Sequence, residues 1–172
     1  MSEVSIQLRA PTTADGAALH ALVRACRPLD ENSMYCNLLQ CTHFARTCCV
    51  AQAGDRLVGF VTGYRLPEDP AVYFLWQVGV HADAAGQGLA RRMIQDILAR
   101  PACAGVTTLH TTITRDNEAS RALFASLARA ETAEMTEEEF FTPEHFGDSG
   151  HAGEYLFRIG PLSTPPAAPH AV

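Results

Sequence analysis

Apolar and polar positions along this chain repeat with two periods, one of two residues and one near 3.6 residues. A two-residue alternation, or a short β-branched and aromatic run between turn residues, indicates a β-strand. Such stretches occur at residues 6–9, 47–53, 57–65, 72–80, 106–113 and 155–159. Gly54-Asp55 separates the second stretch from the third, so these two are predicted to form a β-hairpin.

The 3.6-residue period marks helices. Leu19, Leu22 and Val23 share one helical face after Thr12 and Asp15, whose spacing is that of a capping box. Three more helices are predicted over residues 33–44, 88–100 and 117–127. Proline, which lacks an N–H, ends the first of these four helices and the one over 88–100.

The order of these elements predicts an α/β domain. The strands come first as a hairpin meander and are then joined through helices, which favours a mixed, mostly antiparallel central sheet with helices on both faces. One core fits a chain of 172 residues, so we expect one domain over residues 1–160. The Pro- and Ala-rich residues 161–172 are expected to be a disordered tail. Residues 131–153 are acidic and turn-rich, and 134–140 are interpreted as a solvated acidic face.

The net charge and the cysteine spacing argue against several classes of binding partner. A net charge of −6 without a basic run argues against nucleic acid and anionic membranes as partners. The first residues have no apolar segment typical of a signal peptide, and no apolar run is long enough to span a bilayer. The six cysteines have no zinc-ligand spacing, so we expect no metal and reduced core thiols in a cytoplasmic protein.

A strand, a glycine-rich turn and a helix follow one another between residues 74 and 100. Small residues at Gly86, Gly88 and Ala90 allow a ligand to approach the main chain, and N–H groups at a helix start attract anions. The turn therefore predicts a phosphate cradle. It lacks the Gly-Lys pair of a nucleotide-binding P-loop, and Arg91 occupies the third glycine position of a dinucleotide fingerprint.

AGQGLA, residues 85–90, resembles the pyrophosphate loop of the GNAT superfamily of acetyl-CoA-dependent N-acetyltransferases, and NEASRALF, residues 117–124, resembles a second superfamily element. Two positions depart from the pattern. Ala85 stands where Arg or Gln is usual, and Phe124 where many members have an acidic Tyr. The resemblance implies acetyl-CoA as cosubstrate, held by Val78, Val80, Gly86, Gln87, Gly88, Leu89, Ala90, Asn117 and Ser120. Val78 and Val80 would act through main-chain N–H groups.

A closer resemblance extends over roughly residues 6–160 and is to the diaminobutyrate γ-N-acetyltransferases of ectoine biosynthesis. Six segments carry it in order, and they are residues 29–51, 58–70, 74–80, 86–90, 116–124 and 151–161. It implies acetyl transfer from acetyl-CoA to the γ-amine of L-2,4-diaminobutyrate, and a cytoplasmic homodimer.

The reaction needs a proton acceptor, because an alkyl ammonium with a pKa near 10.4 must lose a proton before it attacks a thioester. Glu154 and His151, within the matching C-terminal segment, are the candidates for amine binding and proton acceptance. The sequence does not choose between them. Residues of this kind are more often surface charges.

Four further residues are candidates for substrate binding, and each has a structural alternative. Asp30 is either an ammonium ligand or a helix N-cap, and Tyr35 is either a contact or a core residue with a wet hydroxyl. Trp76 borders the presumed acetyl position, although a lone Trp is usually core. Gln77 could bind the substrate carboxylate or be a solvated edge-strand residue.

Two other functions fit the same residues. One is a GNAT enzyme acting on a different small amine, such as a polyamine or an antibiotic. The other is a regulator that binds acyl-CoA without catalysis, which Ala85 and Phe124 permit.

Overall fold

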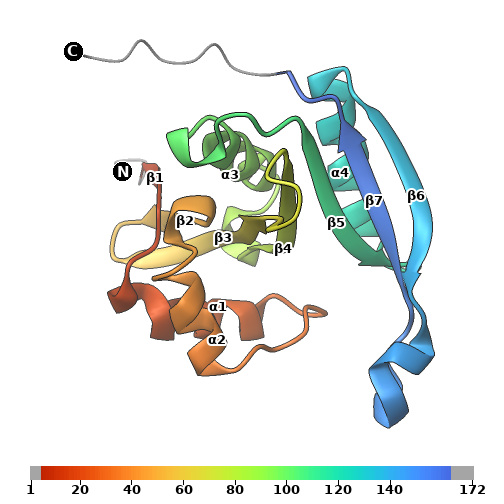
Figure 1. The fold of residues 1–172 in the computed structure, drawn as a ribbon. Coiled ribbons are helices and arrows are strands. Elements are labelled where there is room, and N and C mark those ends of the chain that lie inside the picture. Colours follow the sequence, from red (N-terminus) through yellow and green to blue (C-terminus); the bar gives the residue numbers. More distant parts are fainter. Residues whose placement is uncertain (1–4, 164–172) are drawn as a thin grey trace. The chain divides into compact units, whose positions relative to one another are not determined.

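The structure is a computed structural model that describes residues 5–163, and its contacts divide the chain into two compact units. Unit 1 comprises Met1–Tyr64 and Leu75–Cys103, and unit 2 comprises Arg65–Phe74 and Ala104–Val172. Figure 1 shows the elements of both units in sequence colours. Residues 164–172, most of the predicted tail, lie outside the described residues.

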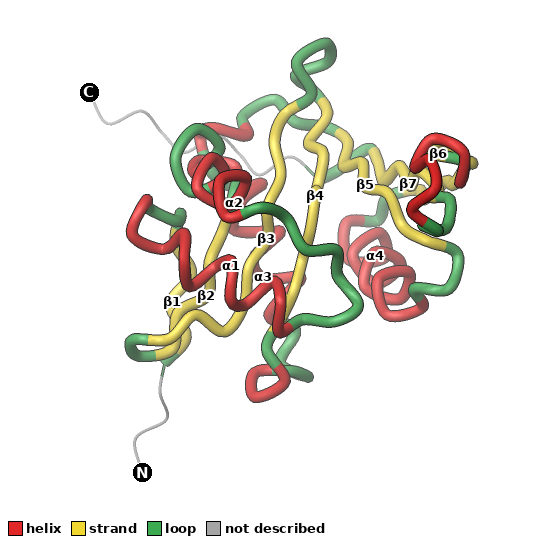
Figure 2. The backbone as a smooth tube through the Cα atoms, turned by 90° about the horizontal axis from the view of Figure 1, so that it is seen from below, coloured by secondary structure: helices red, strands yellow, loops and turns green. Residues whose placement is uncertain are grey.

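The strands of unit 1 form an antiparallel meander. β1 (Ile6–Arg9) pairs with β2 (Cys49–Ala53), and β2 pairs with β3 (Arg56–Arg65) across the predicted Gly54-Asp55 turn. Most of β4 (Val72–Val80) also belongs to this unit. Figure 2 shows β1, β2 and β3 side by side. The predicted hairpin is confirmed.

The helices of unit 1 are α1 (Gly16–Ala25), α2 (Met34–Gln40) and α3 (Leu89–Leu98). Val50 and Phe60 pack in one cluster with the apolar residues of α1. The neighbouring Gly59 faces α3, because a Cβ added there would lie 3.0 Å from the Met93 methyl group. Consecutive residues of a strand point to opposite faces, so α1 and α3 cover opposite faces of these strands.

Unit 2 contains β5 (Thr108–Thr114), α4 (Glu118–Glu131), β6 (Glu134–Phe141) and β7 (Glu154–Gly160). β7 pairs antiparallel with β5 on one side and with β6 on the other. Figure 1 shows α4 behind these strands, and the Arg121 guanidinium of α4 lies over the Phe157 ring of β7. Short 3-10 helices in the chain are Thr13–Asp15, Ala45–Thr47, Ala82–Ala84, Pro101–Cys103 and Pro143–Ser149.

The strand order is β1-β2-β3-β4-β5-β7-β6 in a seven-stranded sheet. The four pairings of β1 with β2, β2 with β3, β5 with β7 and β6 with β7 are antiparallel. The predicted α/β class, with a mostly antiparallel sheet and helices on both faces, is confirmed.

Several local predictions are also confirmed. The Thr12–Asp15 capping box is present, and Asp15 further binds the Arg9 guanidinium through both carboxylate oxygens at 2.8 Å. All six cysteines are free thiols, four of them buried and Cys26 and Cys36 half-buried. Thiols in these positions act as small core residues.

Residues 134–140 are mostly exposed, as the interpretation of a solvated acidic face requires, but the prediction of a turn-rich segment is wrong here, because residues 134–141 form β6. Its side chains are mostly exposed on both faces, so the strand has no apolar alternation to reveal it. It is held instead by main-chain pairing with β7, and its exposed side chains also form two ion pairs, Glu138 with Arg158 at 2.5 Å and Glu137 with Arg121 at 2.7 Å. Pairing between distant segments is invisible to a local pattern.

Helix ends differ from the prediction, by the largest margins at two places. The helix predicted over 33–44 ends at Gln40, and residues 41–44 form turns in which the Phe44 N–H bonds the Leu39 carbonyl at 3.2 Å. The helix predicted to stop at residue 127 continues to Glu131 and ends at Thr132, whose φ of 53° is left-handed. Neither end carries the glycine or proline signal that marks a stop.

Candidate active site

One group of predicted site residues lies in unit 1, in the glycine turn of residues 85–90, which leads from β4 into α3. Gly86 and Gly88 have φ angles of 77° and 64°. Side chains with a Cβ rarely adopt this left-handed region, so glycine is required by the backbone at Gly88, the N-cap of α3. A Cβ at Gly88 would meet nothing within 4 Å, which leaves the main chain open to approach.

The start of α3 is electrostatically suited to an anion. No side chain caps the helix, and its first turn contains no acidic residue. The first N–H groups of a helix have no intrahelical carbonyl partner and carry partial positive charge. Arg91 and Arg92 are exposed in the same turn. The turn therefore fits the diphosphate of coenzyme A, which the sequence predicted here, while Val78 and Val80 lie half-buried in β4 just before it.

Asn117 and Ser120, the other predicted cofactor contacts, lie at the start of α4 in unit 2. The Asn117 side chain caps this helix by accepting a hydrogen bond from the Ser120 N–H at 3.0 Å. This gives the pair a structural role, and their contact with the cofactor stays a prediction. Phe124, one turn further along, is buried with 1% of its surface exposed. It has no acidic proton to donate.

Asp30 and Tyr35 flank the end of the α1–α2 loop, residues 26–33. Ser33 is the N-cap of α2, accepting from the Cys36 N–H at 3.1 Å, so the alternative of Asp30 as N-cap is wrong. Tyr35 is 70% exposed and is not a core residue. Both side chains are therefore placed where a ligand could reach them, and their role in substrate binding stays a prediction.

Trp76 and Gln77 lie together in the second half of β4. Trp76 is 40% exposed and meets Tyr64 edge to face, with ring centroids 6.3 Å apart. Gln77 is half-buried, and both the oxygen and the nitrogen of its side-chain amide form hydrogen bonds with the α1–α2 loop. Its Oε1 accepts from Asn32 Nδ2 at 2.7 Å, and its Nε2 donates to the Asp30 main-chain carbonyl at 2.8 Å.

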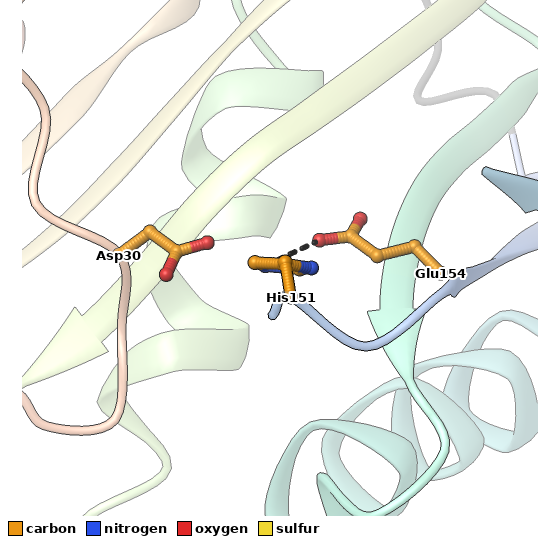
Figure 3. Close-up of side chains that lie close together, drawn as sticks. All are labelled: Asp30, His151 and Glu154. Atoms are coloured by element: carbon orange, nitrogen blue, oxygen red, sulfur yellow. Dashed lines mark ion pairs between the residues drawn. The ribbon is translucent and has the colours of Figure 1, made fainter. Parts of the chain in front are cut away.

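Another group of predicted site residues lies in unit 2 and is the pair His151 and Glu154 at the entry to β7. Figure 3 shows them pointing toward each other, with 3.8 Å between His151 Nε2 and a Glu154 carboxylate oxygen. Both side chains are only about one-fifth exposed, at 21% and 19%. Gly153 between them lies against β6, because a Cβ there would come within 2.9 Å of the Phe141 carbonyl. The tight approach fixes the main chain that carries the pair.

The imidazole of His151 is oriented by two neighbours. Its Nδ1 lies 2.5 Å from the Ala152 carbonyl, and its ring stacks on Phe146 with centroids 4.0 Å apart. A carbonyl oxygen only accepts, so Nδ1 carries the hydrogen and Nε2 is the nitrogen that can take up a proton. Glu154 faces that nitrogen and would stabilise the resulting imidazolium. The pair can thus accept one proton from a bound amine.

Sequence reasoning missed two residues that shape these surroundings. Phe146 supports the His151 ring, and Asn32 bonds the Gln77 amide. Asn32 lies within the matching segment that supplied Asp30 and Tyr35, so its place near them was available as a signal. Phe146 lies in the stretch interpreted as turn-rich surface and carried no such signal.

The acetyltransferase (GNAT) family matches residues 17–128, which include the glycine turn and most of α4. The chain belongs to this family.

Curated relatives narrow the comparison within the family. The chain is 48% identical over 166 residues to an L-2,4-diaminobutyric acid acetyltransferase of Bordetella parapertussis, covering 96% of this chain and 89% of the relative. It is also 48% identical to the protein of the same description from Methylotuvimicrobium alcaliphilum, covering 91% of each chain.

A solved structure gives the same result in three dimensions. It is diaminobutyrate acetyltransferase EctA from Paenibacillus lautus, in complex with L-2,4-diaminobutyric acid and coenzyme A. The TM-score is 0.90 at 34% identity, covering 95% of this chain and 99% of that one. Among the residues that the structure describes, no helix is both long and apolar enough to cross a membrane.

Proposed function

We propose that this protein transfers the acetyl group of acetyl-CoA to the γ-amine of L-2,4-diaminobutyrate, forming N-γ-acetyldiaminobutyrate for ectoine biosynthesis. The observation that carries the proposal is the 48% identity to a diaminobutyric acid acetyltransferase across 96% of the chain. The glycine turn and the His151–Glu154 pair add the chemistry that such a transfer needs.

Acetyl-CoA supplies the acetyl group as an activated thioester. In the proposal, main-chain N–H groups from Gly86 to Ala90 bind its diphosphate, which accounts for the left-handed glycine and the uncapped helix start. The N–H groups of Val78 and Val80 hold the pantetheine and the acetyl carbonyl. A main-chain donor aimed at a developing oxyanion typically lowers the barrier by about 3 kcal/mol.

The His151–Glu154 pair takes the proton that the γ-ammonium must lose. The neutral nitrogen then forms a bond to the thioester carbonyl carbon, and the carbon–sulfur bond breaks as the tetrahedral intermediate collapses. The nitrogen, positively charged after the attack, releases its second proton to solvent, and the product is a neutral amide. Coenzyme A leaves as its thiolate. With Phe124 in place of an acidic Tyr, no acid is assigned to that sulfur, and a thiol pKa of about 8.5 makes departure as thiolate acceptable.

Recognition of diaminobutyrate requires ligands for two ammonium groups and one carboxylate. The proposal assigns Asp30 and Glu154 to the ammonium groups, because charge-assisted hydrogen bonds discriminate strongly between amines. Tyr35 and Trp76 offer exposed aromatic surfaces, and Trp76 borders the proposed acetyl position.

A product assay tests the proposal. Purified protein is incubated with acetyl-CoA and, separately, L-2,4-diaminobutyrate, L-2,3-diaminopropionate, L-ornithine, L-lysine, putrescine and an aminoglycoside, and products are identified by mass spectrometry and NMR. We expect turnover with diaminobutyrate and acetylation at its γ-nitrogen. Turnover only with another amine would favour the other GNAT function, and coenzyme A binding without turnover would favour the regulator.

Two further features belong to the proposal. A homodimer is supported by the exposed edge strand β6 with its exposed Phe140 and Phe141, since such edges are usually covered. A cytoplasmic location is supported by the six free thiols, which suit a reducing compartment. Light scattering after gel filtration should give twice the chain mass of 18.6 kDa, and a value equal to one chain would exclude the dimer.

A further inference from the structure

The side-chain amide of Gln77 joins strand β4 to the α1–α2 loop, which is more than 40 residues away in sequence. Gln77 accepts from Asn32 Nδ2 at 2.7 Å and donates to the Asp30 carbonyl at 2.8 Å. We propose that Gln77 is a positioning residue that fixes the α1–α2 loop and so sets where Asp30 meets the amino acid substrate. The proposal rests on the proposed function of diaminobutyrate acetylation.

The α1–α2 loop is fixed at both of its ends. Cys26 bonds back into α1 and, with Leu29, packs against the buried core. Ser33 caps α2 at the other end. Between them, Glu31 pairs with Arg24 and Arg27 through exposed side chains, and such ion pairs are screened and contribute little. The half-buried Gln77 amide therefore adds two hydrogen bonds between the middle of the loop and strand β4.

The contact is made to the main chain of Asp30. Gln77 bonds the main-chain carbonyl of Asp30 and not its carboxylate. The carboxylate is carried on a main chain whose position is set by the strand that also carries Trp76. Small shifts of a charged ligand change the affinity for an ammonium group strongly, because the hydrogen bond needs a short, aligned contact.

A glutamine is the side chain that fits these two partners. Its amide accepts on one side and donates on the other, which matches the Asn32 donor and the Asp30 acceptor. Glutamate has almost the same shape but only accepts when ionised, so it would face the Asp30 carbonyl without a proton to donate. The Gln77→Glu substitution therefore breaks one bond of the contact and keeps the size of the side chain.

Steady-state kinetics of Gln77→Ala, Gln77→Glu and Asn32→Ala test the proposal. We expect the KM for diaminobutyrate to rise about tenfold in Gln77→Ala and Gln77→Glu, and less in Asn32→Ala. The KM for acetyl-CoA and the kcat should stay within about twofold of wild type, because the contact does not touch the cofactor. Glu31→Gln, which removes only the exposed ion pairs of the same loop, is the control and should leave all three constants unchanged.

Two further measurements separate positioning from direct contact with substrate. In the Gln77→Ala/Asn32→Ala double variant, the effects should be far from additive, since either change breaks the shared contact. Hydrogen exchange over residues 26–33 should accelerate in both single variants and not in Glu31→Gln.

Unchanged kinetics in Gln77→Ala, or a raised KM with normal loop exchange and no effect of Asn32→Ala, would overturn the proposal. The second pattern would make Gln77 a direct substrate ligand. A wild-type protein without activity on diaminobutyrate would instead remove the proposed function, and this inference with it.

Discussion

The glycine turn and the segment from 131 to 153 differ in what determines their structure. The turn is specified locally: two glycines with positive φ, an uncapped helix and a preceding strand are all adjacent in sequence. The later segment depends on distant partners, because β6 is held by β7 and Phe146 supports His151. A backbone conformation that requires glycine can be predicted from the local sequence, whereas the pairing of distant segments cannot.

The largest expected effect tests the non-local region. Glu154→Gln removes the carboxylate that faces His151 Nε2 and should lower kcat/KM for diaminobutyrate by ten- to roughly a hundredfold, at least about 1.4 kcal/mol of transition-state stabilisation. Glu139→Gln removes an exposed carboxylate of the same segment and should leave the rate unchanged. Wild-type kinetics in Glu154→Gln would take Glu154 out of the site.

The pH dependence of kcat/KM distinguishes the two candidate proton acceptors, His151 and Glu154. His151→Gln should lower kcat/KM and also abolish the acidic limb of its pH dependence if the imidazole takes the proton. An acidic limb that survives in His151→Gln but is lost in Glu154→Gln would assign the proton to the carboxylate.

The second largest effect is expected in the glycine turn, where Gly88 can be compared with a matched glycine, Gly54. Gly88→Ala and Gly54→Ala each place a Cβ at a left-handed φ, 64° and 58°, where nothing lies within 4 Å. Both should lose about 1 kcal/mol of stability from backbone strain. The KM for acetyl-CoA should rise about tenfold only in Gly88→Ala, because only Gly88 is proposed to lie against the diphosphate. Equal cofactor KM values in the two variants would contradict the cradle.

A second local motif, Arg9 with the Thr12–Asp15 box, has a smaller effect and acts on stability. Hydrogen bonding from Arg9 lowers the pKa of Asp15 to about 2. A depressed pKa stabilises the fold above the unfolded value, near 3.9, and this contribution is lost as pH falls toward 2. Asp15→Asn should therefore unfold more easily in urea at pH 7, by about 2 kcal/mol. The difference from wild type should shrink below about pH 4, and a constant difference would exclude this charge effect.

The smallest effect concerns the thiols. Burial raises the pKa of Cys48 to about 12 and the pKa values of Cys41 and Cys49 to about 11. Few thiolates then exist at pH 8, so a thiol reagent should label the half-buried Cys26 and Cys36 first, and the other four only after denaturation. Rapid labelling of all six in the native protein would contradict the buried positions.

The sequence predicted the elements whose signals are periodic or local. β1 and β4 were predicted with the same bounds that the structure shows, and the capping box was found at its position. β6 was missed because its side chains are exposed on both faces and its pairing partner follows later in the chain.

The candidate site residues also differ in whether a local pattern predicts them. Gly88 was predicted from its turn, and the structure gives the reason in its φ angle. His151 and Glu154 were predicted only through resemblance. The distance of 3.8 Å between their side chains depends on β7, which begins at Glu154. The partners of Gln77 could not be predicted, because the Asp30 carbonyl and the Asn32 amide are 47 and 45 residues away in sequence.

The central claim is that main-chain amides of the glycine turn bind coenzyme A. Titration of nitrogen-15-labelled protein with coenzyme A, followed by amide resonances, tests it most directly. Binding at the turn should give the largest shifts at Val78, Val80 and residues 86–91, with the Gly54 turn unchanged. Saturable binding that leaves residues 86–91 unshifted and moves resonances elsewhere would contradict it.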